Sequence, residues 1–380
     1  MKYYLIAGEA SGDLHGSNLI KALQQKDAHA DIRCWGGDLM QQTGATLVKH
    51  YKHLAFMGFI EVIKNLRTIF KNLSFCKKDV LYYKPDVLIL IDYPGFNLRI
   101  AKWAHQQHIK IIYYISPQVW AWKASRVKNI KKYVDKMLVI LPFEKAFYQK
   151  YNYLVDYVGH PLVQVIEQFK KQYSFQPLFP NHQPNDTIVA LLPGSRKQEI
   201  AKKLPIMLAA TKAFPQCVFI LAQAPGLEDD FYNNYIKKYP NVYSVKNNTY
   251  ALLINAKAAV VTSGTATLET ALFALPEVIC YKGNAISYAI AKRLVHIKYI
   301  CLVNLILDRE VVKELIQDDV TAENIQKELH ALLYNEQCKQ QLQQDYDMLK
   351  SLLSKTGDAS ENAADIIWKA VDRLYETGIS

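Results

Sequence analysis

The chain has 380 residues, half of them hydrophobic, with six cysteines and a formal net charge of +11. This length exceeds that of most single hydrophobic cores and predicts two domains, and the composition excludes a disordered chain. No apolar run approaches the roughly 18 residues of a membrane-spanning helix. The scattered cysteines form no CxxC pair, which favours reduced thiols in a cytoplasmic protein. The positive charge favours an anionic partner: nucleic acid, an anionic membrane or a phosphorylated substrate.

The first half alternates short apolar runs with amphipathic stretches, the βαβ rhythm of a parallel sheet covered by helices. Strands are expected at 3–7, 31–35, 86–91, 110–115, 136–141 and 154–158. Pro177, Pro180 and Pro184 then interrupt the pattern, because proline breaks both helices and ladder strands. We therefore predict a first domain over 1–172 and a linker over 173–186.

The rhythm restarts in the second half, with strands expected at 187–192, 217–222, 242–245, 258–262 and 277–281, and only helices from 308 onward. These features predict an α/β fold of two Rossmann-like domains facing a cleft, the second over 187–360. The last helix, 361–380, is assigned separately because it could pack back on the first domain. Ligands of such sheets bind at the carboxyl ends of the strands, so the loops there are the candidate sites.

Two loops of the first half follow apolar strands. The segment GEASGD at 8–13 offers Glu9, Ser11 and Asp13 at a helix N-terminus that would receive anions or polar sugar atoms, although Ser11 or Asp13 could simply cap that helix. Asp92 directly follows the apolar run VLILI. Partial burial there would raise the pKa of its carboxyl toward that of a general base. Alternatively, Asp92 would satisfy backbone donors in a proline-containing turn.

A third loop, SPQVWAW at 116–122, carries aromatic and amide side chains that suit sugar faces and hydroxyls. We assign Ser116, Gln118 and Trp120 to the binding of an acceptor. Lysines and Arg126 follow on a basic helix that would meet phosphate or an anionic surface, or simply be solvated.

In the second half, PGSRKQEI at 193–200 combines a glycine turn, a helix start and Arg196, a combination that suits a diphosphate. The loop TSGTATLE at 262–269 is similar, and Glu269 would bind ribose hydroxyls or merely stabilise the helix dipole. Two anion-receptive loops predict a bound nucleotide diphosphate. Metal-ligand spacings and Asp-x-Asp sequences are missing from these loops, so we expect neither a metal nor another cofactor.

These motifs in this order, together with MGFIEVI at 57–63, LPFEKAFY at 141–148 and NLILDREVVKELIQ at 304–317, resemble the lipid A disaccharide synthase family of GT-B glycosyltransferases over nearly the whole chain. The resemblance implies inverting transfer of 2,3-diacylglucosamine from its UDP donor to 2,3-diacylglucosamine 1-phosphate, which forms a β-1,6 disaccharide and UDP. It implies Asp92 as the base and places Glu9, Ser11 and Asp13 on the acceptor side. The residues expected on the donor side are Gly194, Ser195, Arg196, Glu199, Ser263, Gly264, Thr265, Glu269 and Asn304.

The sequence departs from the common family pattern at two positions. Gly95 stands where an acid often follows the proline, which removes a competing base and favours Asp92. Val303 stands where proline often precedes Asn304, which puts the geometry around that asparagine in question.

The segment 56–75 has apolar residues at helical spacing beside lysines and Arg67, a pattern typical of either an interfacial membrane helix or a helix packed on its own sheet. Because acylated substrates come from a bilayer, the resemblance favours a peripheral position on the inner membrane, and a homodimer is an allowed assembly. Two rival functions remain: a UDP-sugar epimerase of the same architecture, and a basic RNA-binding protein. The basic residues are scattered and form no RNA-binding signature, so we expect no nucleic acid partner.

Overall fold

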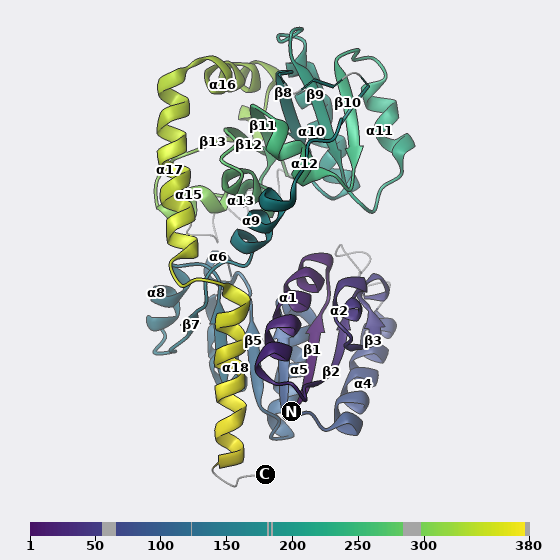
Figure 1. Cartoon of the computed structure of the whole chain (residues 1–380), viewed down its shortest axis with the longest axis vertical. Coiled ribbons are helices and arrows are strands. Elements are labelled where there is room, and N and C mark those ends of the chain that lie inside the picture. Colours follow the sequence, from purple (N-terminus) through teal and green to yellow (C-terminus); the bar gives the residue numbers. More distant parts are fainter. Residues whose placement is uncertain (55–65, 123, 181, 184, 284–297, 377–380) are drawn as a thin grey trace. The chain divides into compact units, whose positions relative to one another are not determined.

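The computed structural model describes residues 1–54, 66–122, 124–180, 182–183, 185–283 and 298–376, and it divides into two compact units. Unit 1 comprises Met1–Pro161 with Ser354–Ser380, and unit 2 comprises Leu162–Leu353 (Figure 1). Each unit has its own parallel sheet with helices on both faces.

Unit 1 contains a seven-stranded parallel sheet in the order β3-β2-β1-β4-β5-β6-β7. Of its two central strands, β4 is fully apolar and buried along its whole length, and β1 is buried except at Lys2, as expected when helices cover both faces of a parallel sheet. The chain order reverses between β1 and β4, which is the switch point where ligands of such folds bind. The strands are β1 (Lys2–Ala7), β2 (Asp31–Gly36), β3 (Thr46–His50), β4 (Val87–Ile91), β5 (Ile111–Tyr114), β6 (Lys136–Val139) and β7 (Asp156–Tyr157).

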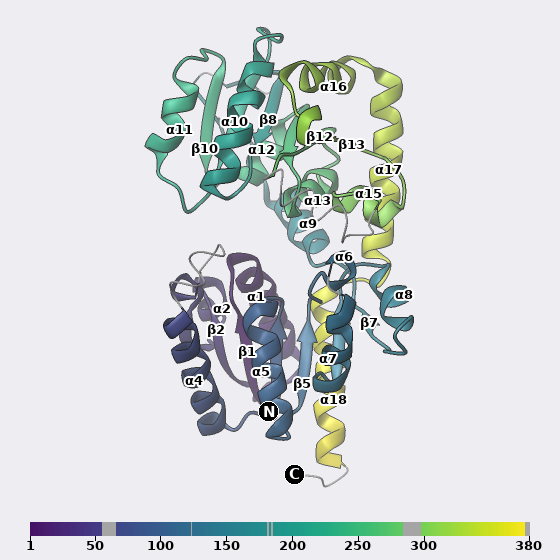
Figure 2. The ribbon, with the colours of Figure 1, turned by 180° about the vertical axis from the view of Figure 1, so that it is seen from behind.

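The helices of unit 1 lie on opposite faces of this sheet: α1 and α18 on one face, with α4, α5 and α7 on the other (Figures 1 and 2). Lys26 of α1 pairs with Asp365 of α18 at 2.8 Å, which ties the two ends of the chain together. The helices and 3-10 turns are α1 (Ala10–Lys26), α2 (Asp38–Gln42), η1 (Tyr51–His53), α4 (Leu66–Tyr83), α5 (Pro94–Gln106), α6 (Val119–Trp122), η2 (Ala124–Arg126), α7 (Val127–Tyr133), α8 (Glu144–Gln149) and α18 (Ala359–Glu376).

Unit 2 contains a six-stranded parallel sheet in the order β10-β9-β8-β11-β12-β13, with its switch point between β8 and β11. The predicted α/β class with two Rossmann-like sheets is therefore confirmed. The strands are β8 (Ile188–Leu192), β9 (Val218–Gln223), β10 (Val242–Lys246), β11 (Ala258–Thr262), β12 (Glu277–Tyr281) and β13 (Lys313–Ile316). The helices and 3-10 turn are α9 (Leu162–Gln172), α10 (Lys197–Thr211), α11 (Asp229–Ile236), α12 (Thr249–Asn255), α13 (Thr265–Leu272), α15 (Leu302–Leu307), η3 (Gln317–Asp319), α16 (Ala322–Tyr334) and α17 (Glu336–Ser354).

Two strands were missed by sequence reasoning. The expectation that only helices follow residue 308 was wrong, because β13 pairs in parallel with β12, and β3 was not predicted either. Both lie at the edge of their sheets, and apart from Leu315 their residues are half-buried or exposed. Because an edge strand needs no continuous apolar run, the sequence carries little sign of it.

The units divide at Pro161 and not within the expected linker at 173–186. The reason is the packing of α9: its Phe169 contacts the rings of Tyr250 and Phe273, and its Lys170 donates to the Leu272 carbonyl at 2.8 Å. The helix therefore belongs to unit 2. The chain returns to unit 1 at Ser354, seven residues before the expected boundary at 361.

Candidate functional site

The first candidate loops lie side by side at the switch point of unit 1. Ala7 and Ile91 are register partners in β1 and β4, so the segment from Gly8 and the segment from Asp92 leave the sheet together. A β-carbon on Gly8 would lie 2.3 Å from the ring of Tyr93, so the tyrosine ring packs directly on the glycine. This close approach requires glycine at position 8.

Asp92 has a constrained backbone. Asp92 and Tyr93 both have left-handed φ angles, +43° and +48°, which cost of order 1–3 kcal/mol each for residues other than glycine. The Asp92 carbonyl accepts hydrogen bonds from the Asn97 amide at 2.8 Å and the Tyr113 hydroxyl at 2.5 Å, while its N–H donates to the Tyr114 carbonyl. Strain held in this way is typical of functional sites.

The Asp92 carboxyl is a strong base for an aspartate. Burial, helped by the nearby negative charge of Glu9 and opposed by a hydrogen bond from the Tyr93 N–H, raises its pKa to about 6. An acid with this pKa is mostly ionised at neutral pH and can still accept a proton.

The other residues of the first loop divide into two groups. Glu9 and Ser11 are exposed at the start of α1, and no side chain caps that helix. Asp13, by contrast, is 3 % exposed, and its carboxylate accepts the backbone N–H groups of Gly37, Leu39 and Met40. Asp13 therefore caps α2 and not α1, and it shapes the loop beside the site.

The third loop is held by the segment that follows β6. The Ser116 hydroxyl is 2.6 Å from that of Tyr148, and the Trp120 ring packs edge to face on Phe143 at 5.0 Å between centroids. Gln118 is exposed and Trp120 is half-buried, so both present atoms to the surface.

Sequence reasoning missed Glu144, which lies in the same segment. Burial raises the pKa of this carboxyl to about 7, against hydrogen bonds that include the Leu141 N–H. The sequence signal was an acid in the LPFEKAFY segment, directly after a buried strand.

The switch point of unit 2 brings together two helix N-termini. Leu192 and Val261 are register partners, so the loops that precede α10 and α13 emerge side by side. The residues that precede these helices, Arg196 and Gly264, make no side-chain capping hydrogen bond. Free N–H groups and the positive ends of two helix dipoles at one edge can bind a diphosphate.

The first donor-side loop is tight and exposed. Gly194 has a φ of +116°, and a β-carbon there would lie 3.2 Å from a carboxylate oxygen of Glu199. Arg196 is 65 % exposed and its Nη1 is 3.5 Å from Oε1 of Glu199. An exposed pair of this length stabilises the fold by at most about 1 kcal/mol, so the guanidinium can move to another anion. Ser195 is exposed beside it.

The second donor-side loop presents Gly264 and Thr265 to solvent, with Ser263 half-buried. Glu269 accepts a hydrogen bond from the Tyr250 hydroxyl at 2.9 Å, and burial raises its pKa above the ordinary range. It is thus not a solvated acid of the first helical turn.

The position of Asn304 does not fit the expected contact with the UDP-sugar donor. Its side chain is fully buried, its Oδ1 accepts the N–H groups of Val311 and Val312, and its Nδ2 donates to the Val312 carbonyl and to Glu314. Because these bonds use the whole amide, Asn304 fixes the connection from α15 to β13 and has no polar atom left for a ligand.

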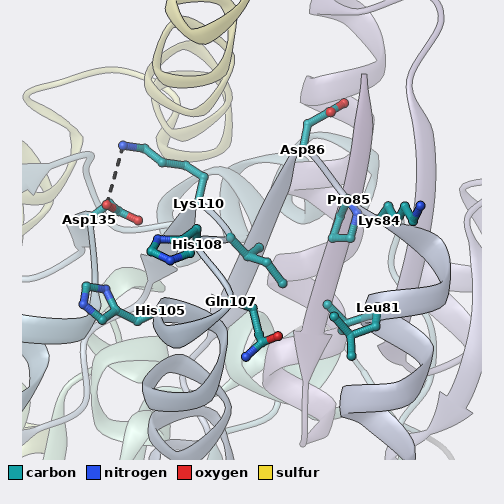
Figure 3. Close-up of a pocket in the computed structure, with 11 residues that line it drawn as sticks. Leu81, Lys84, Pro85, Asp86, His105, Gln107, His108, Lys110 and Asp135 are labelled. Carbon is teal, nitrogen blue, oxygen red and sulfur yellow. Dashed lines mark ion pairs between the residues drawn. The ribbon is translucent and has the colours of Figure 1, made fainter. Parts of the chain in front are cut away.

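A hollow lies at the other edge of the unit 1 sheet. It measures about 940 Å³ and is lined by residues at the amino ends of β4, β5 and β6. Figure 3 shows His105, His108 and Lys110 around it, with Lys110 directed at Asp135, 3.7 Å away. Positive and negative side chains alternate around this hollow. The strained Asp92 lies at the opposite edge, at the carboxyl ends of the strands, so the hollow is not assigned to the reaction.

A family model described as lipid-A-disaccharide synthetase matches residues 3–371. The chain belongs to the lipid-A-disaccharide synthetase family. It is 38% identical over 366 residues to a lipid-A-disaccharide synthase from Syntrophus aciditrophicus, with 95% of each chain covered. It is also 38% identical over 367 residues to one from Coxiella burnetii, with 96% of each covered. Members of this family are glycosyltransferases, which confirms the predicted enzyme class.

Solved structures show the same architecture at low identity. UDP-GlcNAc 2-epimerase from Neisseria meningitidis, bound to UDP-GlcNAc, superposes with a TM-score of 0.69 at 13% identity and covers 97% of this chain and 100% of its own. The glycotransferase of kitacinnamycin gives 0.67 at 14%, covering 97% and 99%. At such identities these likenesses show the fold alone.

Two further properties bear on the family's chemistry. Among the described residues, no helix is long and apolar enough to cross a membrane. Within the same ranges, no three His, Cys, Asp or Glu side chains are grouped closely enough to hold a metal ion.

Proposed function

We propose that this chain transfers 2,3-diacylglucosamine from its UDP donor to the 6-hydroxyl of 2,3-diacylglucosamine 1-phosphate, with inversion, to give the β-1,6 disaccharide and UDP. The observation that carries the proposal is the family match over residues 3–371. The site geometry supports it, because a strained, basic aspartate lies at one switch point and paired helix N-termini lie at the other.

The chemistry divides between the two units. Asp92 takes the proton of the acceptor hydroxyl as its oxygen attacks the sugar C1, a step with oxocarbenium character. Arg196, with the N-termini of α10 and α13, stabilises the negative charge of the departing diphosphate, and Glu269 binds the ribose. Glu9, Ser11, Gln118 and the Trp120 ring position the acceptor sugar.

The test of the reaction is incubation of the full chain with both substrates, followed by mass spectrometry. The expected products are the disaccharide and UDP in equal amounts, and neither should form when the acceptor is omitted. Turnover of the UDP donor alone would instead indicate epimerase chemistry, the activity named for the structurally similar enzyme from Neisseria meningitidis.

We also propose that α4 contributes to contact with an anionic membrane surface. Residues 56–65 of the expected segment 56–75 lie outside the described residues. In the described part, Phe70 is 61 % exposed and Phe75 is 46 % exposed, with Lys71, Lys77 and Lys78 nearby in sequence. Leu73, in contrast, is buried in the core of unit 1, so this helix also packs on its own sheet.

Sedimentation with vesicles tests the membrane proposal. The protein should sediment with phosphatidylglycerol vesicles at low salt and be released at high salt, since screening weakens attraction between exposed charges. Phe70→Ser should reduce binding, and the matched control Tyr334→Ser, an exposed aromatic residue in unit 2, should not. Equal binding of both variants would contradict the role of α4.

A further inference from the structure

Unit 2 has a small pocket far along its sheet from the donor-side loops. It measures about 200 Å³ and lies at the amino ends of β12 and β13, whereas α10 and α13 begin at carboxyl ends. Helices α16 and α17 cover it, and Figure 1 shows these helices beside the two strands. Its apolar walls include Val278, Val312, Leu332 and Leu342.

Glu277, which lines this pocket, is an unsatisfied buried carboxyl. It is 1 % exposed, and neither of its carboxyl oxygens has a hydrogen-bond partner among the residues that the structure describes. An unpaired buried polar group destabilises the fold, and more so when it is charged. A ligand that pairs with Glu277 would therefore recover a substantial free energy.

The charges around the pocket select a cation. Glu310 and Glu328 also line it, and the single lysine, Lys313, is already paired with Glu310 at 3.1 Å. Burial and then the negative charge of Glu328 raise the pKa of the Cys338 thiol, which lines the pocket from the opposite helix. Because valine and leucine side chains line much of the pocket, it fits a cation that carries its own hydrogen-bond donors and apolar surface.

We propose that this pocket binds a short primary alkylamine: its ammonium group donates hydrogen bonds to Glu277, and its methylene chain lies against the valine and leucine walls. A diamine fits best, because its second ammonium group can pair with Glu328. The four apolar side chains match the methylene chain, and burial of each CH₂ group against them stabilises the complex.

Proton release accompanies this binding. Burial raises the pKa of Glu277 well above its ordinary value and so favours the protonated carboxyl in the free protein; the Tyr346 hydroxyl and the Cys301 thiol are close enough to interact with its charge. When R–NH₃⁺ binds, the carboxylic acid transfers its proton to solvent and the carboxylate pairs with the ammonium group. Affinity therefore rises with pH until Glu277 ionises in the free protein or the amine loses its own proton.

The experiment is isothermal titration of the full chain with 1,4-diaminobutane in two buffers of different ionisation enthalpy. We expect one binding site, release of protons on binding, and tighter binding at pH 8.5 than at pH 6.5. 1-Aminobutane should bind more weakly and 1-butanol at least tenfold more weakly, because only the amines carry the charge.

Glu277→Gln keeps the shape of the side chain and removes the charge, so diamine affinity should fall at least tenfold and proton release should vanish. Asp347→Asn, on the exposed face of α17, is the matched control and should bind as wild type does. No heat with any amine, equal binding by Glu277→Gln, or equal binding of butanol would each overturn the proposal. If Glu277→Gln does not fold, as judged by circular dichroism, proton release and the butanol comparison on the wild type still decide it.

Discussion

Replacing Asp92 with asparagine tests two effects of its carboxylate separately: the stability lost by burying its charge, and its role as the catalytic base. In the folded chain the carboxyl has a pKa of about 6, against an ordinary value of 3.8. The folded state thus holds the proton more tightly than the unfolded state does, so this residue's contribution to stability falls as pH rises from about 4 to about 6. At pH 7.5 the folded protein carries the whole cost, roughly 3 kcal/mol for a shift of this size.

Asp92→Asn removes that charge without changing the side-chain volume. Part of the stability gained by removing the charge is lost with the hydrogen bond from the Tyr93 N–H to the carboxylate. We therefore expect unit 1 to melt about 5 °C higher at pH 7.5. The difference should disappear near pH 4, where the wild-type carboxyl is protonated. Turnover should fall about 10²- to 10⁴-fold because the base is gone, while UDP affinity should not change.

Differential scanning calorimetry, a disaccharide assay and titration with UDP measure these three effects. The matched control is Asp156→Asn, which removes a half-exposed aspartate of the same unit that is paired with Lys136. It should shift the melting temperature by no more than a degree or two and leave turnover unchanged. A variant at position 92 that melts no higher than wild type would refute the buried-charge reasoning, and one with near-normal turnover would remove Asp92 from the mechanism.

Three further predictions follow from the site. The kcat/KM of the wild type should fall tenfold per pH unit below about pH 6, as Asp92 becomes protonated. Glu9→Gln should move this fall to lower pH, because it removes a negative charge that raises the pKa of Asp92. A flat pH profile of kcat/KM between pH 5 and 7 would contradict this. Arg196→Ala should weaken UDP binding about ten- to a hundredfold in a titration without lowering the melting temperature, since the side chain is 65 % exposed. Asn304→Ala should destabilise unit 2 by about 3 kcal/mol and keep UDP affinity at low temperature, because the Asn304 amide hydrogen-bonds to other parts of the chain. Weaker UDP binding with an unchanged melting temperature would instead indicate that Asn304 contacts the UDP donor.

The sequence by itself determined which loops are the candidate binding and catalytic sites. Alternating apolar runs placed a loop after each central strand, and the rule that ligands bind at the carboxyl ends of parallel strands selected the segments after 7, 91, 192 and 262. These inferences were possible because central strands are buried on both faces and read as continuous apolar runs. The edge strands β3 and β13 escaped notice since they are short and partly polar.

Only the tertiary structure decided what each polar side chain in or near these loops bonds to. Asp13 caps a helix 24 or more residues away in sequence, Asn304 bonds a strand that follows it, and Glu277 has no partner among the described residues. It also decided that α9 belongs to unit 2 and α18 to unit 1. Side-chain hydrogen bonds and helix docking depend on segments that are distant in the chain and close in space, and local patterns of residue type carry no record of those distances.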